Sequence, residues 1–350
     1  MPKICAVCTS VPPYVIEQEE AKDFAEHVFR DRLKDIDRLL PLFENAGIQT
    51  RYFSVPIEWF EKDHSLEEKN QLYIKSATEL GAAASRKLFD QAGVSPSDID
   101  CIFYVNTTGL ATPSIDARLI NVLGLRHDIR RTPIWGLGCA GGVAGLTHAY
   151  DYLLGHPSHR VLLIAVELCG LTFIPGDYSK SNIVACALFG EGAAAVLLSG
   201  DEVEGKGSEI MAVQSTFYPD SLEIMGWNII SKGMQVVFNK RIPDLVAEKA
   251  RPELDVFLAD NQLKKRDIKY FLYHPGGMKV LNAYKEALVV EDSALALSRS
   301  ILNDYGNMSS ATVLFVIERF LARVQATGND YAVVSALGPG FCSESLLLCH

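Results

Sequence analysis

Apolar residues follow two different spacings along this 350-residue chain, and the alternation between them predicts an α/β fold. Short continuous apolar runs at residues 4–9, 101–105 and 160–166 are typical of buried strands. The segment from Val143 to Leu154 instead carries apolar residues at helical spacing. Because both patterns recur in each half of the chain, we expect strands and helices packed in layers around an extensive core.

The chain also repeats one plan. About forty residues separate Asp98, which precedes an apolar run, from Cys139 in a glycine-rich loop. About the same distance separates Asp267, which precedes another apolar run, from Asn307 in the loop Gly-Asn-Met-Ser-Ser. The matched spacing predicts two duplicated α/β halves that place Cys139 and Asn307 on equivalent, facing loops.

The boundary between the halves is expected in the glycine- and charge-rich stretch 199–208. This divides the chain into an N-terminal half at residues 1–200 and a C-terminal half at 209–350. Residues 17–68 look like a helical, charged addition to the first half, and residues 227–238 look like a corresponding insertion in the second. We expect such additions to shape a substrate entrance.

Charge and cysteine content exclude several classes of function. The formal net charge is −10 and the basic residues are scattered, so a nucleic-acid partner is not expected. No apolar stretch approaches the ~20 residues that a membrane span requires, and the first residues do not resemble a signal peptide. The eight cysteines are dispersed through apolar segments rather than grouped as metal ligands, which favours reduced thiols in a cytoplasmic enzyme without a metal site.

Cys139 is the first candidate for chemistry, because it lies among glycines just before the helical segment. A helix start would lower the pKa of its thiol toward neutrality and favour the thiolate. A small buried cysteine beside a glycine turn is the alternative interpretation. His274, between an apolar strand and a Pro-Gly-Gly turn, and Asn307 would join Cys139 if the two halves face each other. A thiol with a histidine and an amide suits chemistry on thioesters or amides.

Five motifs, spread over nearly the whole chain, resemble those of the type III polyketide synthases, the chalcone-synthase-like family, in order and spacing. They are Gly-Cys-Ala-Gly-Gly at 138–142, Leu-Phe-Gly-Glu-Gly at 188–192, His-Pro-Gly-Gly at 274–277, Gly-Asn-Met-Ser-Ser-Ala at 306–311 and Gly-Pro-Gly-Phe at 338–341. The resemblance implies a thiolase-type five-layered αβαβα fold made of two pseudo-symmetric halves, and a homodimer. It also implies repeated decarboxylative condensation of malonyl-CoA onto an acyl-CoA starter, without a metal or organic cofactor.

The resemblance also implies roles for individual residues. Cys139 would carry the acyl chain, His274 and Asn307 would stabilise the enolate left by decarboxylation, and His274 would keep Cys139 ionised. The loop Gly338, Pro339 and Gly340 would border cyclisation. Arg38 is the one basic position that matches a CoA contact of the plant enzymes. The residues that would form the gate and the substrate pocket are Phe189, Val236, Cys169, Thr172, Trp227, Thr107 and Thr108.

Departures from the plant pattern point to the substrate. Val236 stands where chalcone synthases have a second gate phenylalanine, and Cys169 stands at a pocket-lining position, which together favour an aliphatic chain. Trp227 stands where a glycine is usual, and its side chain would close the substrate cavity in one direction. The sequence motif around Cys139 is similar to that of bacterial alkylpyrone and alkylresorcinol synthases. We therefore expect a fatty acyl-CoA starter and an alkylpyrone product. A ketoacyl-ACP synthase III-like enzyme and a non-catalytic acyl-binding homologue remain alternatives.

Overall fold

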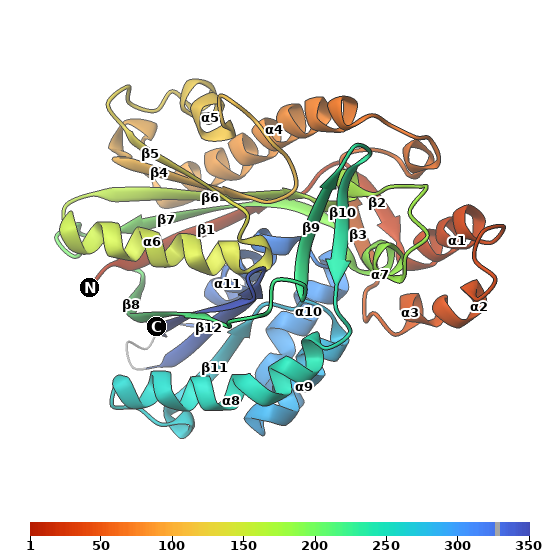
Figure 1. Ribbon diagram of the computed structural model, residues 1–350. Helices are drawn as coiled ribbons and strands as arrows, with labels where there is room; N and C mark the ends of the chain where they lie inside the picture. Colours follow the sequence, from red (N-terminus) through yellow and green to blue (C-terminus); the bar gives the residue numbers. More distant parts are fainter. Residues whose placement is uncertain (326–329) are drawn as a thin grey trace.

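A nine-stranded mixed sheet runs through the whole molecule in the computed structural model, which describes residues 1–325 and 330–350 (Figure 1). The strands of the first half are β1 (Lys3–Ser10), β4 (Cys101–Asn106), β5 (Arg130–Trp135), β6 (Arg160–Leu168) and β7 (Glu191–Ser199). Those of the second half are β8 (Ser208–Phe217), β11 (Ile268–Tyr273), β12 (Tyr331–Gly338) and β13 (Cys342–Cys349).

The two halves of the sheet share one strand order. The first half reads β5-β4-β6-β7-β1 and the second reads β11-β12-β13-β8, so β1 corresponds to β8 and β4 to β11. The halves join where Lys3 and Ile4 of β1 pair antiparallel with Glu209 and Ser208 of β8. The described part of the second half has no strand equivalent to β5. The pseudo-symmetric halves predicted from the spacing are therefore present, although they share one continuous sheet.

Helices complete five layers. One outer layer holds α4 (Leu66–Ala92) and α5 (Ile115–Leu123), which pack on the first half of the sheet. The central layer holds α6 (Gly141–Gly155) and α11 (Thr312–Arg323), which contact strands of both halves. The other outer layer holds α8 (Ile242–Asp260), α9 (Met278–Leu288) and α10 (Ala296–Tyr305). This αβαβα arrangement confirms the predicted fold class.

The layers explain the apolar patterns. β4, β6 and β7 are covered by helices on both faces and are buried along nearly their whole length, which is why they read as continuous apolar runs. α6 lies between the two half-sheets and is apolar on most of its circumference for the same reason.

The first addition holds a strand as well as helices, and the second is a pair of strands. Residues 17–68 contain α1 (Gln18–Phe29), α2 (Ile36–Leu39) and α3 (Pro41–Glu44), but β3 (Thr50–Phe53) pairs antiparallel with β2 (Tyr14–Glu17). The purely helical expectation was wrong for β3, because its side chains alternate between half-buried and buried positions with the period of a strand. The second addition is the hairpin of β9 (Met225–Ile230) and β10 (Gly233–Phe238).

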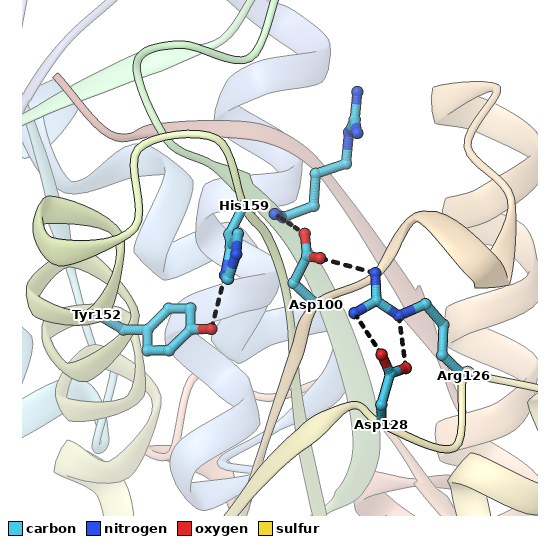
Figure 2. A network of polar contacts seen from close by, with 6 residues as sticks. Asp100, Arg126, Asp128, Tyr152 and His159 are labelled. Atoms are coloured by element: carbon cyan, nitrogen blue, oxygen red, sulfur yellow. Dashed lines mark hydrogen bonds and ion pairs between the residues drawn. The ribbon is translucent and has the colours of Figure 1, made fainter.

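A polar network joins the starting ends of β4 and β6 (Figure 2). Asp100 accepts hydrogen bonds from Nη1 of Arg126 (2.9 Å) and from the backbone N–H of Arg160 (2.7 Å). Arg126 also binds Asp128, and the Tyr152 hydroxyl lies 2.8 Å from Nδ1 of His159. These groups satisfy one another, so we assign the network to the architecture of the fold.

All eight cysteines are free thiols. Among the described residues, no helix combines the length and the apolar character that crossing a bilayer would need.

Candidate active site

Three loops from both halves meet at one cavity. Cys139 lies in a short 3₁₀ turn, Gly138–Ala140, that leads directly into α6. His274 follows β11, where its backbone N–H donates to the carbonyl of Ser335 (2.8 Å). Asn307 follows α10 and α7 (Lys180–Leu188) holds it in place, because its N–H donates to the carbonyl of Leu188 (2.8 Å). All three side chains are buried and line a cavity of about 370 Å³, which we call the outer cavity.

The side chain of Asn307 contacts the Cys139 sulfur and two neighbouring backbone groups. Oδ1 of Asn307 lies 3.9 Å from Sγ of Cys139 and accepts the backbone N–H of Ser309 (2.8 Å). Nδ2 of Asn307 donates to the carbonyl of Gly276 (3.2 Å), which leaves its second hydrogen free for a ligand. Neither ring nitrogen of His274 has a hydrogen-bond partner among the described residues, although both are buried. The cavity therefore offers a thiol, an imidazole and an amide N–H to one bound molecule.

The protonation states differ from the expectation for a cysteine at a helix start. Burial raises the pKa of the Cys139 thiol to about 12, and the hydrogen bonds with Ser309 and Asn307 offset this only in part. Burial also lowers the pKa of His274 to about 3. The expected low pKa of the thiol was wrong because desolvation outweighs the helix start. At neutral pH the resting pair is a thiol beside a neutral imidazole, which can accept the thiol proton during attack.

We expect the alkylation of Cys139 by iodoacetamide to rise steadily with pH between about pH 5 and pH 9, because the thiolate is the reactive form. In this window His274 is already neutral, because its pKa lies below it, and the thiol stays protonated, because its pKa lies above it. The rate should increase about ten-fold per pH unit without reaching a plateau, because the thiolate fraction grows in that proportion below the pKa of the thiol. Mass spectrometry of the peptide that contains Cys139 measures the rate, and a sigmoid centred between pH 6 and pH 8 would contradict a neutral resting pair.

The loop predicted to border cyclisation packs against the cysteine loop. Gly138 has a φ of +48°, and a Cβ on it would lie 2.6 Å from Cδ of Pro339. A Cβ on Gly338 would lie 2.4 Å from the carbonyl oxygen of Leu137. Only glycine fits at either place, so the loop from Gly338 to Gly340 lies directly behind the turn that carries Cys139.

A second cavity of about 60 Å³, which we call the inner cavity, holds most of the predicted gate and pocket residues. Cys169, Thr172, Phe189 and Val236 line it. The end of α7 separates the two cavities, because Ala187 and Leu188 line the outer cavity while Ala185 and Phe189 line the inner one. Burial raises the pKa of the Cys169 thiol well above its usual value, and the charges of Glu167 and Cys139 raise it further.

Other predicted pocket residues lie elsewhere. Trp227 lines neither cavity; its ring packs on that of Phe189 at 6.0 Å between centroids and backs it from β9. Thr108 lines a separate space of about 20 Å³ that also reaches Thr172. The hydroxyl of Thr107 accepts the backbone N–H of Gly138 (3.0 Å), so its position supports the cysteine loop rather than the lining of a cavity.

Glu167, at the end of β6, links these loops and was missed from the sequence. Its carboxylate accepts hydrogen bonds from the backbone of Thr107 (3.0 Å) and from the hydroxyls of Thr108 (2.8 Å) and Ser310 (2.5 Å). Burial raises its pKa to about 7, and these donors offset part of the rise. A lone acidic residue near the end of an apolar strand was the available signal.

The cationic residues at the outer cavity also differ from the expectation. Arg38 is exposed on α2 and does not line the cavity. Three lysines line it instead: Lys180, Lys240 and Lys279. They lie at the start of α7, in the loop between β10 and α8, and at the start of α9. The sequence suggested Arg38 through its place in the plant pattern alone, whereas these lysines come from segments far apart in the chain.

Comparison with known proteins identifies the family. Models of the N-terminal and C-terminal domains of the chalcone and stilbene synthases match residues 2–202 and 209–350. The chain belongs to the chalcone and stilbene synthase family. A putative chalcone synthase of Bacillus subtilis (strain 168) is 42% identical, over 98% of this chain and 97% of that protein. A 1,3,6,8-tetrahydroxynaphthalene synthase of Streptomyces peucetius subsp. caesius is 38% identical, over 99% of this chain and 92% of that one.

Solved structures agree with this assignment. The 1,3,6,8-tetrahydroxynaphthalene synthase of Streptomyces coelicolor A3(2), a bacterial type III polyketide synthase, superposes with a TM-score of 0.95 at 29% identity and covers 99% of each chain. The protein is thus a type III polyketide synthase of the bacterial branch, an acyltransferase-type condensing enzyme whose family uses CoA thioesters. The family assignment favours this function over the ketoacyl-ACP synthase III-like alternative.

Proposed function

We propose that this type III polyketide synthase loads a fatty acyl group from CoA onto Cys139, extends it with malonyl units and closes the product to an alkylpyrone. The observation that carries the proposal is the outer cavity, which brings Cys139, His274 and Asn307 to one space beside an apolar inner cavity. The presence of the complete set of chemical groups also argues against a non-catalytic acyl-binding role.

Loading is an exchange of thioesters. The Cys139 sulfur attacks the acyl-CoA carbonyl while neutral His274 accepts the thiol proton, and that proton then leaves with the CoA thiolate. The acyl group is now a thioester of Cys139. In this step the second hydrogen of Asn307 Nδ2 donates to the oxygen on which negative charge develops.

Extension begins with decarboxylation. When malonyl-CoA loses CO₂, the electron pair of the broken bond forms an enolate whose oxygen accepts hydrogen bonds from Asn307 Nδ2 and from the N–H of His274. The enolate carbon attacks the Cys139 thioester, and the sulfur leaves as the new carbon–carbon bond forms. Because decarboxylation supplies the carbanion, we propose that no metal or organic cofactor takes part.

The inner cavity supports an aliphatic starter. Beside Cys169 and Val236 its wall is built from aromatic side chains, among them Phe53, Phe60 and Phe173. Contact between these side chains and the methylene groups of an acyl chain buries apolar surface, which is favourable. A starter of malonyl-CoA alone is the second candidate, because a relative named 1,3,6,8-tetrahydroxynaphthalene synthase is 38% identical to this chain.

Product analysis tests the proposal. The enzyme is incubated with malonyl-CoA alone. In parallel, it is incubated with acyl-CoA starters of increasing length together with malonyl-CoA or methylmalonyl-CoA. The masses of the products are measured by mass spectrometry. Pyrones whose masses rise with the starter support the proposal. A pentaketide-derived naphthalene from malonyl-CoA alone, with no incorporation of fatty starters, would replace it with the second candidate.

Replacing Val236 with phenylalanine should shorten the longest accepted starter. Val236 lines the inner cavity and pairs with Trp227 across β9 and β10, so an added ring would take up volume beside Phe189. Competition between short and long acyl-CoA starters gives the ratio of kcat/KM values. The matched control is Val237→Phe, at the next position of the same strand, which lines neither cavity. If both variants showed the same preference for starter length, the proposed position of the acyl chain in the inner cavity would be refuted.

The lysines at the outer cavity are proposed to hold the CoA phosphates. Changing Lys180, Lys240 or Lys279 to alanine should each raise KM for acyl-CoA about two- to five-fold, as expected for exposed ion pairs. Thioesters of N-acetylcysteamine lack the phosphates and should show unchanged KM. Arg38→Ala is the control and should behave as the wild type. If Arg38→Ala raised KM and the lysine variants did not, the contact predicted from the plant pattern would be restored.

We further propose that the enzyme is a cytoplasmic homodimer. β5 is an edge strand of the sheet, and Trp135 at its end is 48% exposed. The indole N–H of Trp135 donates to the carbonyl of Gly109 (3.2 Å). The next residue, Leu110, is also exposed. An exposed strand edge with apolar neighbours favours pairing with a second copy. The free thiols are consistent with a reducing compartment.

A further inference from the structure

Arg51 is a fully buried cation with unused donors. It lies on β3 and is 1% exposed. Its Nη1 donates to the carbonyls of Cys186 (2.5 Å) and Phe189 (2.9 Å) at the end of α7. Its Nε and Nη2 have no hydrogen-bond partner among the described residues, although both are buried. Capping α7 therefore uses only one of the three nitrogens.

The side chain is placed between the inner cavity and the catalytic loops. Arg51 is one of the residues that line the inner cavity. Its stem packs behind the loop of Asn307, since a Cβ on Gly306 would lie 2.8 Å from Cδ of Arg51. Its Cζ lies 5.7 Å from the ring centroid of Phe53, which offers the cation a partial π contact. A molecule that extends from Cys139 past Phe189 would meet this guanidinium.

The unused pair has a definite geometry. Nε–H and Nη2–H project from one edge of the planar guanidinium as a fork, which matches two coplanar oxygens. Burial lowers the pKa of Arg51 to about 10, so the group is still charged at neutral pH. If only hydrocarbon filled the inner cavity, a charged group would keep two buried donors without acceptors, which is unfavourable. An occupant with a pair of oxygens removes that penalty.

We propose that the Arg51 fork binds the two oxygens of an enolised β-dicarbonyl segment in the chain extended from Cys139. This rests on the proposed function, because each condensation onto the Cys139 thioester creates such a segment. In its cis-enol form the segment is planar and presents both oxygens on one side. The starter's alkyl part then lies against the aromatic wall, while Arg51 holds the reactive oxygens in place until the ring closes. A malonyl starter would offer the fork a carboxylate of the same planar geometry.

Protection of Cys139 from iodoacetamide tests the subsite without turnover. Four small probes are compared at pH 7: acetylacetone, which enolises; 3,3-dimethylpentane-2,4-dione, which cannot; pentan-2-one, with a single carbonyl; and malonate. We expect acetylacetone to protect the wild type at a concentration about ten-fold lower than the two non-enolising ketones, as a charge-assisted pair of hydrogen bonds implies. Equal protection by the three ketones would overturn the proposal. Stronger protection by malonate than by acetylacetone would assign the fork to a starter carboxylate and would also overturn it.

Two variants locate the effect. Arg51→Lys keeps the charge without the fork, and Arg51→Met keeps the stem that packs behind Gly306; both should lose the ten-fold advantage of acetylacetone while pentan-2-one protects as before. Arg38→Lys, on an exposed arginine outside both cavities, should retain it. Thermal unfolding and the unprotected alkylation rate show whether a variant is folded, and the comparison of probes on the wild type stands if one is not. Since no CoA substrate is used, failure here is distinct from failure of the proposed starter or product.

Discussion

Replacing Cys139 with alanine should abolish polyketide formation while leaving part of the decarboxylation of malonyl-CoA. We expect the rate of condensation to fall by at least about 10⁴-fold, because no other thiol of the described residues lines the outer cavity and the acyl carrier is lost. His274 and Asn307 remain in place, so the enolate can still form and be quenched by a proton. Release of labelled CO₂ from malonyl-CoA and product formation from an acyl-CoA are measured in parallel.

Cys169→Ala is the matched control for this variant. Cys169 is also a buried thiol, but it lines the inner cavity. Its replacement should leave the covalent acyl-enzyme intact, as detected by mass spectrometry after incubation with acyl-CoA alone. An acyl group that persisted in Cys139→Ala and disappeared in Cys169→Ala would reassign the nucleophile.

Replacing Asn307 with alanine should act on the earlier step. The rate of decarboxylation should fall about 10²- to 10³-fold, the usual consequence of removing one donor to an oxyanion. In the structure the free hydrogen of Nδ2 is the donor, while Oδ1 holds the Ser309 N–H near Cys139. Acylation of Cys139 by acyl-CoA should be affected much less, because His274 still accepts the thiol proton.

The variant Asn307→Asp removes the hydrogen-bond donor of Asn307 but keeps the oxygen that positions Ser309. The carboxylate keeps the acceptor for Ser309 and loses the donor, so its decarboxylation should be as slow as that of the alanine variant. Asn45→Ala is the control at the same cavity, and it should decarboxylate at the wild-type rate. If Asn307→Asp retained the wild-type rate, Asn307 would have only a structural role.

Much of the fold was accessible from the pattern of residues alone. β4 and β6 read as strands because helices cover both of their faces, and a continuous apolar run is the direct consequence of that burial. The equal spacing from Asp98 to Cys139 and from Asp267 to Asn307 reflects the duplicated strand order. β3 was missed because a four-residue strand carries too short a pattern within a helical region.

The candidate site was accessible only in part. Cys139, His274 and Asn307 could be named because glycine-rich loops and family motifs mark them. Thr107 was placed in the pocket, but its hydroxyl turns to the backbone of Gly138. Glu167 could not be assigned, since its three donors come from Thr107, Thr108 and Ser310, of which the last is far along the chain.

The chain's residues alone establish which chemistry is possible: a thiol, an imidazole and an amide on loops that duplicated halves must bring face to face. Their protonation states, the lysines at the outer cavity and the free donors of Arg51 emerge only when the chain is folded. The reason is physical, because pKa values and unmet hydrogen bonds depend on how much water burial removes and on which distant groups replace it. Arg51 is a surface-type residue in the sequence, and packing behind Gly306 makes it a buried cation at the inner cavity.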